Sequence, residues 1–188
     1  MKPTRPTVRG RVLAAAAAAA AVGLAPATAA HARSATPHET KAGAHCIADL
    51  GGGPVRCFDR FTAAVGAATH GRVDDAPATA RSAAGDRAFR SSLKGVIQGT
   101  FFEDVDYGGA SLTIYGAQPC EKDGWVNYQY DLPSAWQNVI SSVQPWAQCW
   151  LWLYPEPDLG GDRDGPFKVN TPDIGPFMND RTKSIGFS

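Results

Sequence analysis

Acidic side chains gather in two short stretches of the chain, and paired carboxylates can catalyse glycoside hydrolysis. Both stretches adjoin paired glycines, where charged side chains are commonly solvated residues of turns. We therefore interpret them as turns and predict no catalytic residue among them. Their members are Glu103, Asp104 and Asp106 in the first stretch, and Glu156, Asp158, Asp162 and Asp164 in the second.

Histidine, the usual general base, is absent from the chain beyond His70. This excludes a Ser-His-Asp or Cys-His site within the later part of the sequence. Tryptophan is frequent there, and Trp150 and Trp152 alternate with leucines as in a strand. Large aromatic side chains of this kind more often fill a core or its edge than form a ligand platform. The residue types thus predict a protein that is not an enzyme.

The four cysteines are an even number, which in an exported chain indicates disulfides rather than free thiols or a zinc site. Three pairings are conceivable. We favour Cys46 with Cys57 and Cys120 with Cys149, because each pair lies within one segment of distinct composition.

The first 32 residues have the pattern of a secretory signal peptide: basic residues, an apolar stretch over 12–24, and Ala30-His31-Ala32 as a cleavage site. We expect a secreted, extracellular protein without a membrane anchor. Without the leader the chain holds fourteen Lys and Arg against eighteen Asp and Glu, a net charge near −4. This balance argues against nucleic acid as a partner.

Composition divides the remaining chain into three parts. Residues 33–44 are polar and are expected to be a disordered N-terminus. Residues 45–95 predict a small disulfide-stapled hairpin, a helix and a linker, because short extended runs flank Gly51-Gly52-Gly53-Pro54 and apolar residues then recur at helical spacing. From residue 96 to 188, short alternating runs with regular Gly, Pro and Asp predict β-structure.

A repeat organises this last part. In each copy an aromatic residue is followed seven positions later by glycine, and a later segment ends in serine, and such repeats predict how two units stack. The pair resembles the two Greek-key motifs of a βγ-crystallin-like domain, of the secreted bacterial type related to crystallin-like metalloproteinase inhibitors. The repeated residues are Phe102, Gly109 and Ser142, then Tyr154, Gly161 and Ser184.

The resemblance implies an all-β fold, in which two Greek keys form a βγ-crystallin-like sandwich preceded by a small hairpin-helix region. It also implies roles for the repeated residues. The glycine takes a positive φ in a folded hairpin, since only Gly does so without steric cost. The aromatic residue lies over this hairpin, and the late serine hydrogen-bonds the strained backbone.

The resemblance further implies calcium sites just before the late serines. Each such site takes an amide or carboxylate and a backbone carbonyl from one key and a hydroxyl from the other, and these oxygen ligands suit a hard cation. The matching metal-binding candidates in this sequence are Asn138, Ser141, Asn179 and Asp180.

Two positions depart from the calcium pattern: Gln137 stands at the first position of copy one, and Lys183 replaces the hydroxyl of copy two. A set made of Asn179, the Arg181 carbonyl and Ser141 remains complete. We therefore expect one weak calcium site, with a Kd of roughly 10⁻⁴ M or poorer, as in extracellular modules. The alternative is that both segments serve only to lock the hairpins.

Three functions remain open at this point. The first is a secreted structural or interaction module, with or without calcium. The second is a proteinase inhibitor that binds an extracellular metalloproteinase through the extra loop from Cys120 to Tyr130, which the disulfide would preorganise. The third is a secreted toxin or hydrolase. The sequence names no partner or target protease and predicts no oligomeric state.

Overall fold

The computed structural model of the protein describes residues 44–92 and 97–188. The predicted signal peptide and residues 33–43 of the predicted N-terminal segment lie outside the described residues. Within the described ranges, no helix has the length and apolar character needed to cross a membrane.

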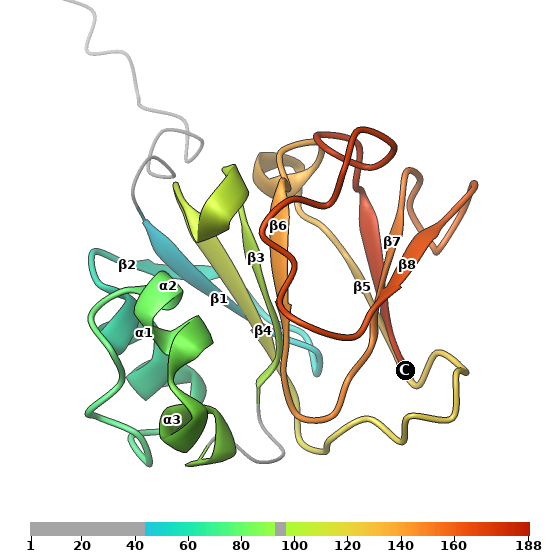
Figure 1. Ribbon diagram of the computed structural model, residues 1–188. Coiled ribbons are helices and arrows are strands. Elements are labelled where there is room, and N and C mark those ends of the chain that lie inside the picture. The colour runs from blue at the N-terminus through green and yellow to red at the C-terminus, as the bar shows by residue number, and fades with distance from the viewer. Residues whose placement is uncertain (1–43, 93–96) are drawn as a thin grey trace, which may run out of the picture. The chain divides into compact units, whose positions relative to one another are not determined.

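Two β-sheets form the framework of the described residues (Figure 1). The first has five strands in the order β2-β1-β4-β3-β6, and the second has four in the order β5-β9-β7-β8. The strands are β1 (His45–Asp49), β2 (Arg56–Phe58), β3 (Ile97–Phe102), β4 (Ser111–Tyr115), β5 (Tyr128–Asp131), β6 (Ser142–Pro145), β7 (Leu151–Tyr154), β8 (Asp164–Phe167) and β9 (Ser184–Phe187).

The two Greek keys exchange strands between the sheets. In the first key β3, β4 and β6 lie in the first sheet, but β5 crosses over and pairs antiparallel with β9. In the second key β7, β8 and β9 lie in the second sheet, while Thr171 bridges to Val143 of β6. Each key thus contributes its third segment to the partner sheet, which relates the keys by an approximate two-fold axis.

The N-terminal part joins this arrangement through β1. Strands β1 and β2 form the predicted hairpin, and β1 also pairs in parallel with β4 from His45↔Ser111 to Asp49↔Tyr115. The first sheet therefore crosses the predicted boundary at residue 95. The division of the chain into residues 45–95 and 96–188 stays a prediction.

Short helices follow β2 and lie against the first sheet. They are α1 (Phe61–Ala68), α2 (Ala80–Gly85) and α3 (Arg87–Ser92), and single 3₁₀ turns occur at Val105–Tyr107 and Ser134–Trp136. The expected helix after the hairpin corresponds to α1, which buries Phe61, Ala64, Val65 and Ala68. The fold is thus mostly β with some helix rather than purely all-β.

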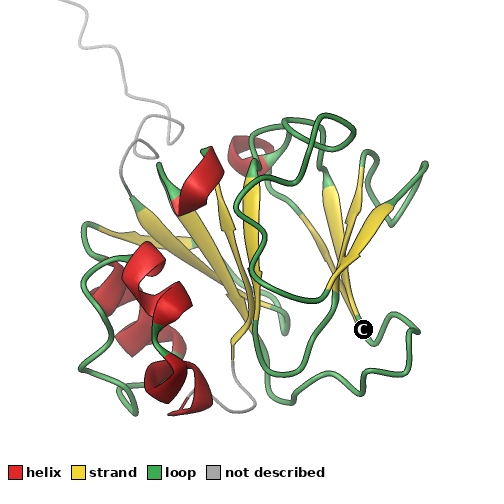
Figure 2. Cartoon of the chain, viewed as in Figure 1, coloured by secondary structure: helices red, strands yellow, loops and turns green. Residues whose placement is uncertain are grey.

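Apolar side chains pack on both faces of the first sheet. Because strand residues alternate between faces, Cys46 and Ala48 of β1 enter the core between the sheets, whereas Ile47 enters the core beneath the helices. Figure 2 shows the helices on one side of this sheet and the second sheet on the other. Phe102, Tyr115 and Trp146 belong to the helix-side core.

Two disulfides close this fold. Cys46 bonds to Cys57 across the β1–β2 hairpin, and Cys120 bonds to Cys149, which ties the β4–β5 loop to the segment that joins the keys. These are the two pairings favoured from the sequence. Disulfides of this kind are typical of an extracellular or otherwise oxidising location.

Candidate functional site

The same folded hairpin follows the first strand of each key. Backbone φ is positive at Asp106 and Tyr107 in the first key and at Asp158 and Leu159 in the second. The glycines expected at this turn also have positive φ: 68° at Gly109 and 80° at Gly161. A Cβ added at Gly109 would lie 2.8 Å from Asp104 Oδ2, and one at Gly161 would lie 2.7 Å from Pro155 Cγ. Both the backbone and the space therefore require glycine.

A buried serine from the last strand of each key holds this hairpin. Ser142 Oγ donates to the Asp104 carbonyl at 2.7 Å and accepts the Tyr107 N–H at 3.1 Å. Ser184 Oγ does the same in the second key, with Glu156 at 2.6 Å and Leu159 at 3.1 Å. Each hydroxyl satisfies one donor and one acceptor that the left-handed turn would otherwise leave unpaired.

The leading aromatics occupy comparable places with different neighbours. Phe102 packs edge-on against Tyr107 of its own hairpin, with ring centroids 5.5 Å apart. Tyr154 receives a hydrogen bond on its hydroxyl from Arg163 at 3.3 Å. Burial raises the pKa of Tyr107, Asp106 adds to this rise and Arg90 opposes it. The phenol therefore stays neutral within the hairpin.

The segments that precede the two serines meet at the junction of the keys. The Asn138 N–H donates to the Thr182 carbonyl at 2.9 Å, and the Asp180 N–H donates to the Ile140 carbonyl at 3.1 Å. Asn138 and Asp180 hold equivalent positions in the repeat, and their φ values are 59° and 55°. The reciprocal bonds bring together residues that lie about 40 positions apart in the sequence.

This junction places all four metal-binding candidates around one hollow of about 710 Å³. Asn138, Ser141, Asn179 and Asp180 line it, together with Glu103, Asp104, Val105 and Val139. Glu103 and Asp104 were interpreted from the sequence as turn carboxylates only. The signal that could have found them is their place directly after the leading aromatic, since that segment adjoins the late serine of the same key.

Two ligand candidates have informative hydrogen bonds. Ser141 Oγ donates to the Glu103 carbonyl at 2.7 Å, so its oxygen lone pairs remain available as acceptors. Asn179 Nδ2 donates to Asp180 Oδ2 at 3.1 Å, but Asn179 Oδ1 is buried and has no hydrogen-bond partner among the described residues. A buried amide oxygen without a donor is uncommon and fits a site that receives a cation.

Gln137 holds in the first key the position that Asn179 has in the second, and its hydrogen bonding is different. Gln137 Nε2 donates to the Leu132 carbonyl at 2.8 Å, which engages this amide in its own loop. Pro155 stands where the first key has Glu103, and Lys183 stands where it has Ser141. The repeat therefore has one oxygen-rich side and one side with an ammonium and a proline.

Carboxylates alone cannot form a metal site here. Across residues 44–92 and 97–188, no group of three His, Cys, Asp or Glu side chains is placed to hold a metal ion. Any cation at the hollow would thus depend on neutral oxygens from amide, hydroxyl and carbonyl groups. Such ligands bind calcium with modest affinity.

Other residues singled out in the sequence make hydrogen bonds or ring contacts within the fold. Asp164 Oδ1 accepts the Gly165 N–H at 2.8 Å, and the Asp158 N–H donates at 2.9 Å to Oδ1 of Asp131, a residue of β5 that the sequence did not single out. Trp152 donates to Ser188 Oγ at 2.9 Å, and the Arg163 guanidinium lies 3.9 Å from its ring centroid. Arg163 thus covers the Trp152 ring, and Asp131 and Asp164 bond to backbone groups.

Two hairpins with left-handed turns, a serine on each and an exchange of strands between two sheets define this architecture. Over about half of its length the chain resembles βγ-crystallin domains. It is similar to a βγ-crystallin domain from Clostridium beijerinckii, with 24% sequence identity over 48% of this chain and 95% of that chain and a TM-score of 0.38.

Two further solved structures are similar over the same share of the chain. The N-terminal domain of Protein S is 22% identical over 48% of this chain and 94% of its own length, with a TM-score of 0.38. A βγ-crystallin domain from Flavobacterium johnsoniae is 20% identical over 48% of this chain and 92% of its own length, with a TM-score of 0.37. No family model and no curated protein matches the chain.

Proposed function

We propose that this βγ-crystallin-like domain binds one calcium ion at the hollow between its keys and serves as a secreted structural or interaction module. The buried, unpartnered Asn179 Oδ1 carries the proposal. Ser141 Oγ supplies the hydroxyl from the opposite key, and the Arg181 carbonyl completes the set that the resemblance implies. Asn138 and Asp180 hold the two segments in register beside it.

The charge around the hollow supports a cation. Glu103, Asp104 and Asp180 are negative and line the hollow without converging into a carboxylate cage. They attract calcium through the local potential, while the neutral ligands set the contact distances. Affinity is therefore expected to be weak, with a Kd of roughly 10⁻⁴ M or poorer.

Titration calorimetry of the purified mature protein with calcium tests this function. We expect a stoichiometry near one and a rise in stability of about 1.4 kcal/mol at tenfold excess of calcium over Kd. Ser141→Ala and Asn179→Ala should abolish the heat signal. Lys183→Ala and Gln137→Ala change the equivalent positions of the other key and are the matched controls, which should leave calcium binding intact.

Loss of the fold must be separated from loss of the ligand. Ser141→Ala also removes the hydrogen bond to Glu103, so the melting temperature without calcium has to be recorded for each variant. Asn179→Asp keeps the side-chain shape and adds a negative charge, and we expect it to tighten calcium binding. Wild-type protein whose melting temperature does not change in several millimolar calcium would contradict the proposal.

We propose a second candidate function, contact with an extracellular protein such as a metalloproteinase, for the loop between β4 and β5. Trp125 near its tip is 78% exposed, and tryptophan is enriched among the residues that dominate protein interfaces. The base of the loop is held by the Cys120–Cys149 disulfide and by the Glu121 N–H, which donates to Asn127 Oδ1 at 3.0 Å. A held loop loses little entropy on binding.

A panel of secreted metalloproteinases assayed with the mature protein tests this second function. Inhibition that Trp125→Ala removes, while the melting temperature stays unchanged, would support it. Val169→Ala is the matched control, because Val169 is a comparably exposed apolar residue outside the loop. If no metalloproteinase of the panel is inhibited, this second function is wrong.

A further inference from the structure

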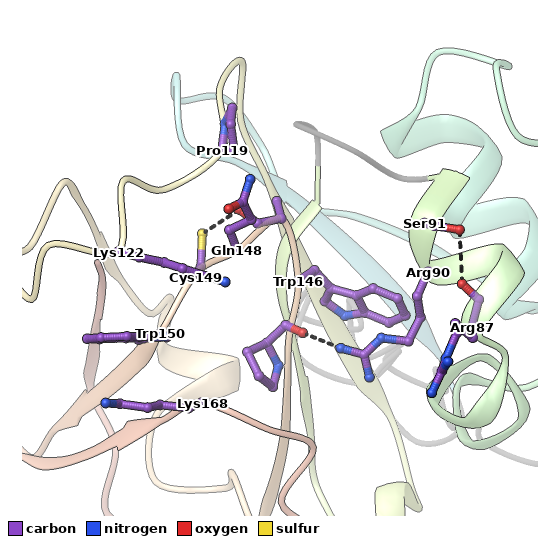
Figure 3. Close-up of a pocket in the computed structure, with 12 residues that line it drawn as sticks. Arg87, Arg90, Ser91, Pro119, Lys122, Trp146, Gln148, Cys149, Trp150 and Lys168 are labelled. Carbon is purple, nitrogen blue, oxygen red and sulfur yellow. Dashed lines mark hydrogen bonds between the residues drawn. The ribbon is translucent and has the colours of Figure 1, made fainter.

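A second concave site lies away from the calcium hollow, between α3 and the segment that joins the two keys (Figure 3). It is a groove of about 810 Å³, a size typical of small-ligand sites. Helix α3 forms one wall, and the β4–β5 loop and the joining segment form the other. Its lining residues include the cations Arg87, Arg90, Lys122 and Lys168 and the aromatic residues Trp146 and Trp150.

The groove concentrates positive charge on a negative protein. From residue 44 onward the chain has twelve Lys and Arg against seventeen Asp and Glu. Four of the twelve cations line this groove, and no Asp or Glu is among its lining residues. Clefts lined by one sign of charge focus the potential and raise the local concentration of ligands of opposite sign.

The walls of the groove are held in place. Arg90 Nη2 donates to the Pro145 carbonyl at 2.9 Å, Nη1 donates to Asn170 Oδ1 at 2.6 Å, and the guanidinium lies 4.7 Å from the Trp146 ring centroid. Burial lowers the pKa of Arg90, which as an arginine remains a cation. A fixed cation beside an indole costs little reorganisation when an anion binds.

The opposite wall is fixed by covalent and backbone bonds. The Cys120–Cys149 disulfide ties the segment that joins the two keys to the loop that carries Lys122. Trp150 exchanges two backbone hydrogen bonds with Ser188, at 2.7 and 3.0 Å. Lys168 Nζ lies over the Trp150 ring at 3.7 Å from its centroid, and this contact holds the ammonium in place at the groove.

A strained turn forms part of the joining segment. Ala147 and Gln148 have φ of 45° and 64°, and the Cys149 N–H closes the turn on the Trp146 carbonyl at 2.7 Å. Residues other than glycine in this conformation cost free energy and are concentrated at functional sites. The turn leaves the Gln148 side chain exposed in the groove, where its amide can donate and accept hydrogen bonds.

We propose that this groove binds a short anionic saccharide, one that carries carboxylate or sulfate groups on its sugar rings. The Lys168 ammonium is held over the Trp150 ring and presents a fixed positive charge to an acidic group of the saccharide. Arg87 and Lys122 flank the groove from its two walls and pair with further acidic groups. Gln148 and Ser91 line the groove and can hydrogen-bond to uncharged hydroxyl groups of the saccharide.

A saccharide fits these observations better than a nucleic acid does. A nucleic acid carries a phosphate at every nucleotide and favours a surface that is basic over a wide area. This protein is negative outside the groove, so a long and dense polyanion would be repelled there. A short ligand with few charges is confined to the positive region.

Titration of tryptophan fluorescence with defined ligands tests the proposal. The probes are a tetrasaccharide of galacturonic acid and a heparin-derived tetrasaccharide, compared with the methyl-esterified neutral form of the first, sodium sulfate and a short single-stranded DNA. We expect saturable binding of at least one acidic saccharide, weaker at high salt, and little binding of the neutral ester. Equal binding of the ester, tighter binding of DNA or sulfate, or no binding of either acidic saccharide would overturn the proposal.

Two exposed cations allow the groove to be altered without disturbing the core. Arg87→Ala and Lys122→Ala should each weaken saccharide binding roughly threefold to fivefold, as expected for exposed charge pairs. Arg81→Ala is the matched control, because Arg81 is an exposed arginine on the neighbouring helix α2 and does not line the groove. Equal affinity of all three variants and the wild type would also overturn the assignment.

Discussion

The Asn138 N–H donates to the Thr182 carbonyl across the junction of the keys, and Asn138 takes this position with a φ of 59°. Asp180 repeats the arrangement with Ile140 in the opposite direction. Asn and Asp adopt the left-handed conformation more readily than other residues with a side chain. The repeat therefore has a conformational requirement at these two positions that is independent of any metal.

This requirement can be measured by changing the side chain at one position. Asn138→Val should lower the free energy of unfolding by about 1–2 kcal/mol, because a β-branched side chain is disfavoured at positive φ. Asn138→Gly should preserve or raise it, since glycine accepts this backbone without steric cost. Chemical denaturation of both variants without calcium gives the comparison. Equal stability of the two variants would contradict the conformational reason.

The late serines should be needed in both keys. Ser142→Ala and Ser184→Ala each leave a part-buried carbonyl and a part-buried N–H without their partner, so we expect each to cost about 1–3 kcal/mol. Ser82→Ala is a control, because its hydroxyl bond to Thr79 is exposed. The measurement is thermal unfolding followed by circular dichroism. Wild-type midpoints for both variants would show that the serines do not hold the hairpins.

Folding stability should depend on the protonation of His45. Burial lowers the pKa of His45, and its Nδ1 lies 2.8 Å from Ser111 Oγ. The unfolded chain takes up the proton near pH 6.5, at a higher pH than the folded chain does. The contribution of His45 is thus complete above that pH and is lost as the pH falls below it.

The variant His45→Gln isolates this effect from the carboxylates, which titrate at lower pH. Denaturation at pH 7.5 and at pH 5.5 should show a larger loss of stability for the wild type than for the variant. The two proteins differ only at residue 45, so the difference between their pH profiles reports on His45. Parallel pH dependence of the two proteins would show that His45 is not the responsible group.

The sequence and the structure differ most over residues 45–95. The hairpin and helix have local signals, namely the glycine-rich turn between two extended runs and the helical spacing of apolar residues. The parallel pairing of β1 with β4 joins segments 66 residues apart, and no local pattern encodes it. Composition therefore indicated a boundary at a place where the first sheet continues.

The two keys could be predicted because their requirements are visible in the local sequence. A hairpin with a left-handed turn needs glycine at one position and a serine hydroxyl at another, so its requirements appear as residue types at a recurring spacing. The involvement of Glu103 in the hollow was not predicted, because a carboxylate in a turn is compatible with simple solvation. Its place directly after the leading aromatic is the signal that could have indicated it, since the Ser141 hydroxyl donates to the Glu103 carbonyl.

The boundary at residue 95 can be tested by deletion. Residues 96–188 alone would lack the helices that cover Phe102, Tyr115 and Trp146, and we expect the fragment to bind ANS and to melt at a lower temperature than residues 33–188. Exposed apolar surface on one face of a sheet is the reason. A fragment that keeps the melting temperature and binds no ANS would support the independent domain predicted from the sequence.

The side of the junction that carries Gln137 and Lys183 should be convertible into a second calcium site. Lys183→Ser restores the hydroxyl and removes an ammonium, and Gln137→Asp supplies a carboxylate at the first position of the motif. Calorimetry of the double variant should give a calcium stoichiometry near two, against one for the wild type. Lys183→Ser alone is the control, because Gln137 stays bonded to the Leu132 carbonyl in that variant. A stoichiometry that remains at one would contradict the assignment of Gln137 and Lys183 as the positions that prevent binding on that side.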